Sequence, residues 1–349
     1  MIKTKLRIGL ACVVALTMTS IAKADDIANF YKGKTVNIIV GAAAGGAYDL
    51  VSRTLANHMS RYIPGNPKII VSNMVGASSL PMVNFLTNAG RKDGTVIGMS
   101  NSNIALERPL KMLSKNGGNV AFDVSKLQWI GSPLQQPHVL WVWHQSPAKT
   151  FEDLKTHKTL VGSIGVGGDN YALPTMLNYL LGTKLEIISG YEGQSDVFVA
   201  AERGEIEGNS AVLPNLTSAK PEWFRDKKVR VLVQFGTTRM RELPDVPTAI
   251  ELATNPFDAQ MLRFYALKFS MAYPLVMAPD VPPARVQAMR DAFDATVKDE
   301  AFLADAKRLG LDVNPFSGLQ MHQLIEEIDA APKEVVDRVA QIIAAPSKP

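Results

Sequence analysis

Cysteine is nearly absent from this sequence. One cysteine, Cys12, occurs in 349 residues, and it lies within residues 1–24, which we expect to be removed from the mature chain. The mature protein would then have no disulfide, no thiol nucleophile and no cysteine-based metal site. A chain of 349 − 24 = 325 residues is long enough to bury a large core without covalent links.

The sequence also lacks a long hydrophobic run. The apolar stretch at residues 8–15 is shorter than the roughly 20 residues that a membrane-spanning helix needs. It follows a basic start and precedes Ala22-Lys23-Ala24, a small-x-small cleavage site. This order of segments is typical of a secretory signal peptide. We therefore predict export to the periplasm, with cleavage after Ala24.

The mature chain has no excess of positive or negative charge. The formal net charge is +4, but residues 1–24 contribute four basic residues and no acid, which leaves +4 − 4 = 0. A neutral chain has no electrostatic reason to bind nucleic acid, and we predict no such partner.

Catalytic and metal-binding patterns are absent as well. The five histidines are scattered without an H-E-x-x-H spacing, and no G-x-S-x-G motif is present. The glycine-rich turn at residues 41–49 has neither the Lys-Ser/Thr ending of a phosphate-binding loop nor the G-x-G-x-x-G spacing. We predict a protein that is not an enzyme and has no cofactor and no metal.

Strand-like and helix-like segments alternate along the mature chain. This alternation predicts an α/β fold with two mixed, mostly parallel sheets. The strand-like runs are residues 35–40, 68–71, 95–99, 139–143, 159–163, 185–189 and 229–234.

One pattern occurs twice, and it points to a binding site. A strand, a glycine-rich turn and a helix follow one another at residues 40–49 and again at residues 161–171. The start of a helix carries unpaired N–H groups and a partial positive charge, so two such turns facing one ligand could hold an anion. In the first turn we expect Gly45, Gly46 and Ala47 to donate N–H groups and Asp49 to orient the loop. As an alternative, the turn is an ordinary connection and Asp49 only favours the first helical turn.

The second turn leaves similar alternatives open. Its candidate ligand contacts are Ser163, Gly165, Gly167 and Gly168. Asp169 can be read as the N-cap of the following helix or as a group that recognises a ligand hydroxyl or amine, and the N-cap is the preferred interpretation.

Polar residues at other strand ends extend the candidate site, because open α/β sheets bind ligands at the carboxyl ends of their strands. These residues are Ser78, Asn101, Ser102, Tyr191 and Asn209. For Asn101, Ser102 and the pair Asn209-Ser210 an ordinary solvated loop is equally compatible, and a core role for Tyr191 remains open.

Several short strings resemble the Bug, or tripartite tricarboxylate transporter, receptor family of periplasmic solute-binding proteins. The resemblance covers essentially the whole mature chain, and its most specific string is Leu-Pro-Asp-Val-Pro-Thr at residues 243–248. The other matching strings are Phe-Tyr-Lys-Gly-Lys at 30–34, Gly45-Gly46 with Asp49 and Arg53, Asn73 with Gly76-Ala77, Lys92-Asp93-Gly94, Tyr191-Glu192-Gly193 and the segment 204–208.

The resemblance implies a two-lobed type II periplasmic binding protein, or Venus flytrap. It implies that the turns at Gly45-Gly46 and at residues 163–168 hold a ligand carboxylate in the cleft between the lobes. This chain departs from the family in the second turn. Many members have Gly-Ser at a position where this chain has Gly168-Asp169. An acid at this position would repel a tricarboxylate unless it faces a hydroxyl, an amine or solvent.

From these patterns we predict lobe 1 at residues 25–135 plus 262–349 and lobe 2 at residues 136–261. The expected partners are a small carboxylate and the membrane subunits of a secondary transporter, and the receptor is expected to be a monomer. Two alternatives are a sensor that reports ligand occupancy to a signalling protein and, less favoured, a periplasmic enzyme acting on small acids.

Overall fold

The computed structural model describes residues 26–111, 118–166 and 168–345. Contacts divide these residues into two compact units. Unit 1 consists of residues 26–104, 118–133 and 273–323, and unit 2 of residues 105–111, 134–166, 168–272 and 324–345. The predicted signal peptide and the candidate residue Gly167 lie outside the described part of the chain.

Unit 1 is built on a six-stranded sheet with the order β11-β4-β10-β3-β1-β2. β1 pairs in parallel with β2 and β3, whereas β10 is antiparallel to β3 and β4, and β11 is antiparallel to β4. The strands are β1 (Thr35–Val40), β2 (Lys68–Asn73), β3 (Val96–Met99), β4 (Gln128–Ser132), β10 (Leu275–Met277) and β11 (Phe316–Ser317).

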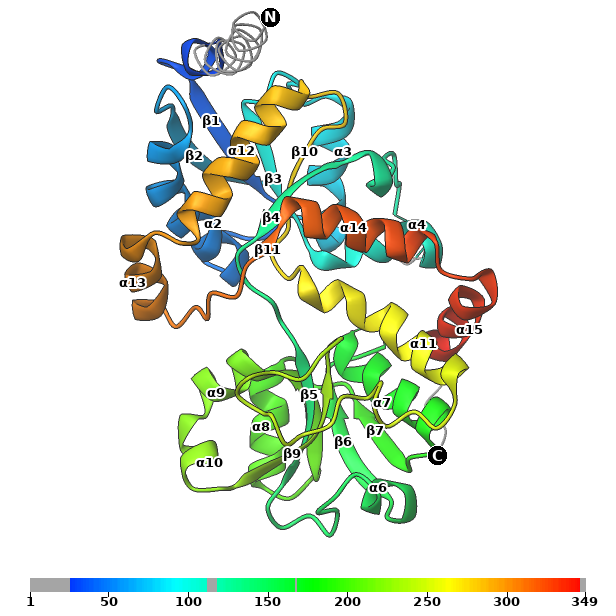
Figure 1. The fold of residues 1–349 in the computed structure, drawn as a ribbon. Helices are drawn as coiled ribbons and strands as arrows, with labels where there is room; N and C mark the ends of the chain where they lie inside the picture. Colours follow the sequence, from blue (N-terminus) through cyan, green and yellow to red (C-terminus); the bar gives the residue numbers. More distant parts are fainter. Residues whose placement is uncertain (1–25, 112–117, 167, 346–349) are drawn as a thin grey trace, which may run out of the picture. The chain divides into compact units, whose positions relative to one another are not determined.

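Helices pack against this sheet through apolar stripes. α2 places Val51, Leu55 and Met59 in the core at the 3.6-residue spacing of an amphipathic helix. α12 packs against both α2 and β4, and α3 packs against β3 (Figure 1). The helices are α2 (Ala47–Met59), α3 (Leu80–Asn88), α12 (Pro283–Thr296), α13 (Glu300–Arg308) and the first part of α14 (Gly318–Asp329).

Unit 2 is built on a five-stranded sheet with the order β7-β6-β8-β5-β9. β6 pairs in parallel with β7 and β8, and β5 runs antiparallel to its neighbours β8 and β9. The strands are β5 (His138–Trp143), β6 (Thr159–Ser163), β7 (Leu185–Ser189), β8 (Gly208–Val212) and β9 (Val229–Phe235).

Three tryptophans lie in the core of unit 2. Trp141 and Trp143 of β5 pack with Trp223 and Phe198, at ring-centroid distances of 4.8–6.2 Å. The helices of unit 2 are α4 (Glu107–Leu110), α6 (Asp153–Thr156), α7 (Asp169–Leu181), α8 (Gln194–Glu202), α9 (Leu213–Ala219), α10 (Pro221–Arg225), α11 (Pro256–Ala266), α15 (Lys333–Ala344) and the end of α14.

The two sheets share one topology. In chain order, β1, β2, β3 and β4 occupy the same places in the first sheet as β6, β7, β8 and β9 in the second. In both sheets an antiparallel strand, β10 or β5, lies between the third and fourth members. The repeated strand–turn–helix pattern of the sequence therefore corresponds to equivalent positions, β1–α2 and β6–α7. The fold is α/β with two mixed sheets, as predicted.

The contact-based units differ from the predicted lobes at four places. The described residues 105–111, 134–135, 262–272 and 324–345 belong to unit 2, whereas the sequence-based division puts them in lobe 1. The longest segment of unit 2 begins where the chain leaves unit 1 at residues 133–134 and ends where it returns at residues 272–273.

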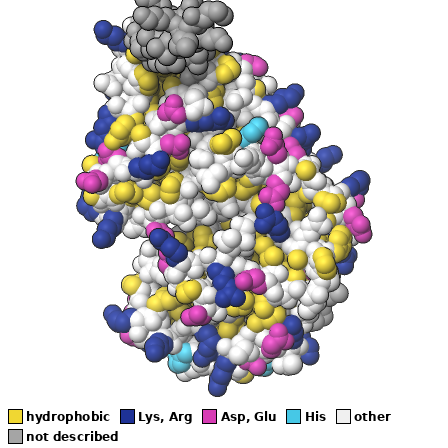
Figure 2. All heavy atoms as spheres, in the orientation of Figure 1, with side chains coloured by type: hydrophobic (Ala, Val, Ile, Leu, Met, Phe, Trp, Pro, Cys, Tyr) yellow, Lys and Arg dark blue, Asp and Glu magenta, His cyan; other side chains and the backbone are white. Residues whose placement is uncertain are grey.

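The described residues include no helix that is both long enough and apolar enough to cross a membrane. On the face drawn in Figure 2, basic and acidic side chains are interspersed rather than gathered by sign.

Candidate functional site

The two glycine-rich turns start their helices in the same way. α2 begins after Gly46 (φ −80°, ψ 174°) and α7 after Gly168 (φ −87°, ψ 158°), and neither cap uses a side chain. The first N–H groups of a helix have no partner within the helix. With no side-chain cap to occupy them, these groups are suited to an anionic ligand.

In unit 1, Asp49 holds the first turn in place. Its carboxylate accepts hydrogen bonds from Gly45 N–H (2.9 Å), Arg53 Nε (2.9 Å) and Asn73 Nδ2 (3.0 Å). The Arg53 hydrogen bond is the main reason that the pKa of Asp49 falls to about 2, although burial acts in the opposite direction. Asp49 thus orients the loop, and one predicted ligand donor, the Gly45 N–H, is already bonded to it.

A buried serine that the sequence analysis did not single out links this turn to the end of β3. Ser79 Oγ donates to the Gly41 carbonyl (3.0 Å) and accepts from Asn101 N–H (2.9 Å). A side chain at Gly41 would collide with Ser79, since an added Cβ would lie 2.3 Å from the serine Cβ. The predicted residue Ser78 precedes it in the left-handed region, at φ 51°.

Asn101 also supports a neighbouring aromatic pair. Its Nδ2 donates to the hydroxyl of Tyr48 (3.2 Å), whose ring packs on Tyr273 at 4.7 Å. Asn101 Oδ1 accepts from Asn103 N–H (2.8 Å), across Ser102. Asn101 therefore shapes the polar end of β3, and its role in ligand binding, like that of Ser102, stays a prediction.

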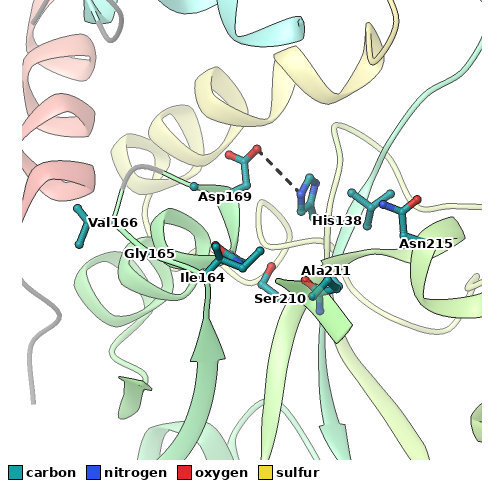
Figure 3. Close-up of a pocket in the computed structure, with 12 residues that line it drawn as sticks. His138, Ile164, Gly165, Val166, Asp169, Ser210, Ala211 and Asn215 are labelled. Carbon is teal, nitrogen blue, oxygen red and sulfur yellow. Dashed lines mark ion pairs between the residues drawn. The ribbon is translucent and has the colours of Figure 1, made fainter. Parts of the chain in front are cut away.

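Unit 2 contains a pocket of about 460 Å³ at the carboxyl ends of its parallel strands (Figure 3). Three of the predicted residues line it: Gly165, Gly168 and Asp169. The other nine residues of its lining are His138, Ile164, Val166, Asn170, Gln194, Ser210, Ala211, Val212 and Asn215.

Asp169 is held by a buried cation. Its Oδ1 accepts from Lys268 Nζ (2.6 Å) and from the Tyr265 hydroxyl (2.8 Å). The Lys268 side chain is 1% exposed, whereas 21% of the Asp169 side chain reaches solvent. Burial alone would raise the pKa of Asp169, but the charge of Lys268 holds it below its usual range.

This arrangement corrects the preferred interpretation of Asp169. The N-cap of α7 is Gly168, and Asp169 is the first residue of the helix itself. The repulsion expected between Asp169 and an acidic ligand is offset by Lys268, which follows it by 99 positions.

His138 faces the same carboxylate from the start of β5. Its Nε2 lies 4.0 Å from Asp169 Oδ2, and its Nδ1 lies 3.2 Å from the Gln136 carbonyl oxygen. The ring packs on Phe269 at 4.6 Å. Burial lowers the pKa of His138, although the neighbouring Asp169 acts in the opposite direction. Burial therefore favours the neutral form of the imidazole.

The other predicted residues of unit 2 lie beneath the pocket rather than on its lining. Ser163 Oγ donates to Asn170 Oδ1 (3.2 Å). Asn209 donates to the Gly162 carbonyl (2.6 Å) and accepts from Gln194 (2.8 Å). Both predicted residues are fully buried, so they position residues of the lining.

Tyr191 has a similar supporting place. It is partly buried and packs against the tryptophan-rich core of unit 2. Burial also raises the pKa of its hydroxyl.

Ser210 is the most unusual member of the lining. Its side chain is fully buried, and its Oγ has no hydrogen-bond partner among the described residues. His138 and Ser210 lie on one face of the sheet, because β5 and β8 pair His138 with Val212 and Leu140 with Ser210.

The described residues contain no group of three or more His, Cys, Asp or Glu side chains that could hold a metal. The pocket instead combines helix N–H groups, amide side chains and a neutralised acid, an arrangement that can bind and orient a small polar molecule.

Comparison with known proteins gives a consistent result. A family model described as "Tripartite tricarboxylate transporter family receptor" matches residues 51–341. A TctC solute-binding protein from Polaromonas has a similar structure, with a TM-score of 0.69 and 17% identity, over 88% of this chain and 99% of that one.

Two further similar structures contain ligands. MatC from Rhodopseudomonas palustris, with bound malate, has a TM-score of 0.54 and 20% identity, over 89% of this chain and 99% of that one. Another R. palustris protein, solved with adipate, has a TM-score of 0.58 and 17% identity, over 88% and 97%. At these identities the likeness shows a shared fold.

Proposed function

This chain belongs to the tripartite tricarboxylate transporter receptor family, and from that premise we propose that it captures a small carboxylate in the periplasm and delivers it to the membrane subunits of a secondary transporter. In this proposal the receptor acts as a monomer and carries out no chemical reaction on its ligand.

The observation that carries the proposal is the pocket of unit 2. Its lining includes Gly165, Gly168 and the first residues of α7. The partial positive charge at a helix N-terminus favours a carboxylate, and the N–H groups there can donate to its oxygens. Because Lys268 already neutralises Asp169, the nearest acid does not oppose a bound anion with a full charge.

The turn of unit 1 is proposed as a second carboxylate contact. The Asp49 hydrogen bonds fix the turn through Gly45, and α2 starts without a side-chain cap. We assign the ligand contacts there to the Ala47 N–H and to the Gly46 N–H, whose hydrogen bond to the Ala43 carbonyl is long (3.4 Å). A rigid turn loses little conformational freedom on binding, which increases affinity.

The small sizes of the ligands in two similar structures, malate and adipate, suggest the range of acids to test. We would screen the purified protein by thermal unfolding against mono-, di- and tricarboxylates, aromatic acids and amino acids. At about 100 times its dissociation constant, a true ligand stabilises the fold by roughly 2.7 kcal/mol. Stabilisation by one class of carboxylates is expected, and no stabilisation by any acid would contradict the proposal.

Delivery to a transporter needs a separate experiment in cells. Uptake of the radiolabelled acid should fall when the gene for this chain is deleted and recover when it is restored. Unchanged uptake in the deletion strain would contradict the delivery step while leaving carboxylate binding intact.

A further inference from the structure

We propose that the pocket of unit 2 recognises a hydroxyl group on the bound acid, so that the preferred ligands are hydroxycarboxylates. The recognising atoms are Ser210 Oγ, His138 Nε2 and Asp169 Oδ2. This inference rests on the proposed function and narrows its ligand class.

The first observation is the Ser210 hydroxyl. It is fully buried, lines the pocket and has no partner among the described residues. Leaving a buried hydroxyl without a hydrogen bond costs about 1–3 kcal/mol. A ligand oxygen in the pocket would remove that cost, because it could accept the serine proton.

The second observation is the orientation of His138. Its Nδ1 lies 3.2 Å from the Gln136 carbonyl oxygen, which can only accept. In the neutral ring Nδ1 therefore carries the proton, and Nε2 is left as an acceptor. Figure 3 shows this ring turned towards the Asp169 carboxylate, with Ser210 below them in the same pocket.

The third observation is that the two carboxylate oxygens of Asp169 have different neighbours. Oδ1 receives the hydrogen bonds of Lys268 and Tyr265. Oδ2 faces His138 Nε2 at 4.0 Å, so two acceptors oppose each other beyond hydrogen-bonding distance. A donor on the ligand, placed beside them, would bond to at least one.

A hydroxyl fits these atoms better than an ammonium group does. A hydroxyl can donate its proton to Asp169 Oδ2 or His138 Nε2 and accept from Ser210 with a lone pair. An ammonium group cannot accept from Ser210. It would also add a second cation beside Asp169, whose charge Lys268 already balances, and burying an unbalanced charge is costly.

The test uses sets of acids that differ in one substituent. Succinate, malate and aspartate share a four-carbon skeleton and carry hydrogen, hydroxyl or ammonium at one carbon. Glutarate, 2-hydroxyglutarate and glutamate form a five-carbon set, and propionate, lactate and alanine a three-carbon set. Dissociation constants would be measured by titration calorimetry on the full chain at pH 7.5, above the ordinary pKa of histidine, which burial lowers further in His138.

In the set that fits the pocket, the hydroxy acid should bind at least about tenfold more tightly than both analogues, since one tenfold step equals roughly one net hydrogen bond to a charged group. Ser210→Ala should reduce this ratio several-fold without lowering the unfolding midpoint, because it removes a hydroxyl that has no partner in the fold. Ser218→Ala, a change on the exposed side of α9, is the matched control and should leave the ratio unchanged.

Three results would overturn the inference. If the deoxy acid binds as tightly as the hydroxy acid, or the amino acid binds more tightly, the pocket does not select a hydroxyl. If Ser210→Ala weakens all three acids equally, the serine has no selective role. In these cases carboxylate binding itself survives, whereas a failure of every acid to bind would remove the proposed function together with the inference.

Discussion

The ion pair between Asp169 and Lys268 gives a prediction about stability that is independent of any ligand. The Lys268 ammonium is almost completely buried, while a fifth of the Asp169 side chain is exposed (1% and 21%). The two single substitutions should therefore have unequal effects. Asp169→Ala leaves a cation that cannot reach water, whereas Lys268→Met leaves a carboxylate that still contacts solvent and the Tyr265 hydroxyl.

The expected magnitudes follow from the cost of a buried charge that has lost its counter-ion. Removing one partner of a buried ion pair destabilises a protein by about 3–5 kcal/mol, and we expect Asp169→Ala to fall in this range. Lys268→Met should destabilise the protein by roughly 1–3 kcal/mol, because the Asp169 carboxylate loses one hydrogen-bond partner but remains partly hydrated. The double variant should be more stable than Asp169→Ala alone, because it contains no buried charge that has lost its counter-ion.

The assay is urea unfolding followed by tryptophan fluorescence. Trp141, Trp143 and Trp223 belong to the core of unit 2, so the signal reports mainly on the unit that contains the pair. The four proteins form a double-mutant cycle, in which neighbouring residues typically show coupling of about 0.5–3 kcal/mol. A loss below about 1 kcal/mol in Asp169→Ala, or additive losses in the double variant, would refute this reasoning.

Three further predictions concern the turn of unit 1 and the support of the pocket in unit 2. Gly46→Val should abolish carboxylate binding with little change in the unfolding midpoint, because an added Cβ meets its nearest atom at an ordinary 3.4 Å; retained affinity in calorimetry would contradict the assignment. Asn209→Ala should weaken binding several-fold, because Gln194 loses the acceptor that positions it in the pocket, and equal affinities would show that this support is unimportant. The stabilisation from Asp49, paired with Arg53, should be complete above pH 3.8 and be lost as the pH falls to about 2, since a carboxylate with a lowered pKa stabilises only while it is ionised. Acid titrations of unfolding should show this loss, and Asp49→Asn should lack it.

Much of the fold could be predicted from the sequence because its strands are short β-branched runs bounded by turns. The predicted strands at residues 159–163 and 185–189 agree with β6 and β7. The apolar run at residues 264–277 gave no such boundaries. It forms the end of α11, a 3₁₀ turn (Leu267–Ser270) and β10, since apolar composition alone does not distinguish buried helix from buried strand.

The site was harder to predict because its groups meet only in three dimensions. His138 was read as one of five scattered histidines, yet the antiparallel course of β5 brings it beside the end of β8. Lys268 lies within the apolar run at residues 264–277, and its partner Asp169 lies 99 positions away. A lone lysine in such a run was the available signal, since a buried lysine nearly always has a partner.

The most direct test of the central claim is titration calorimetry of the stabilising acid with the wild-type protein and with Gly165→Val. An added Cβ at Gly165 meets no atom within 4 Å, and the residue lies outside the left-handed region, so the variant should fold normally while its side chain enters the pocket. The account predicts one carboxylate per wild-type chain, and no measurable binding by a variant with an unchanged unfolding midpoint. Equal binding by the two proteins, or no heat with any carboxylate, would contradict it.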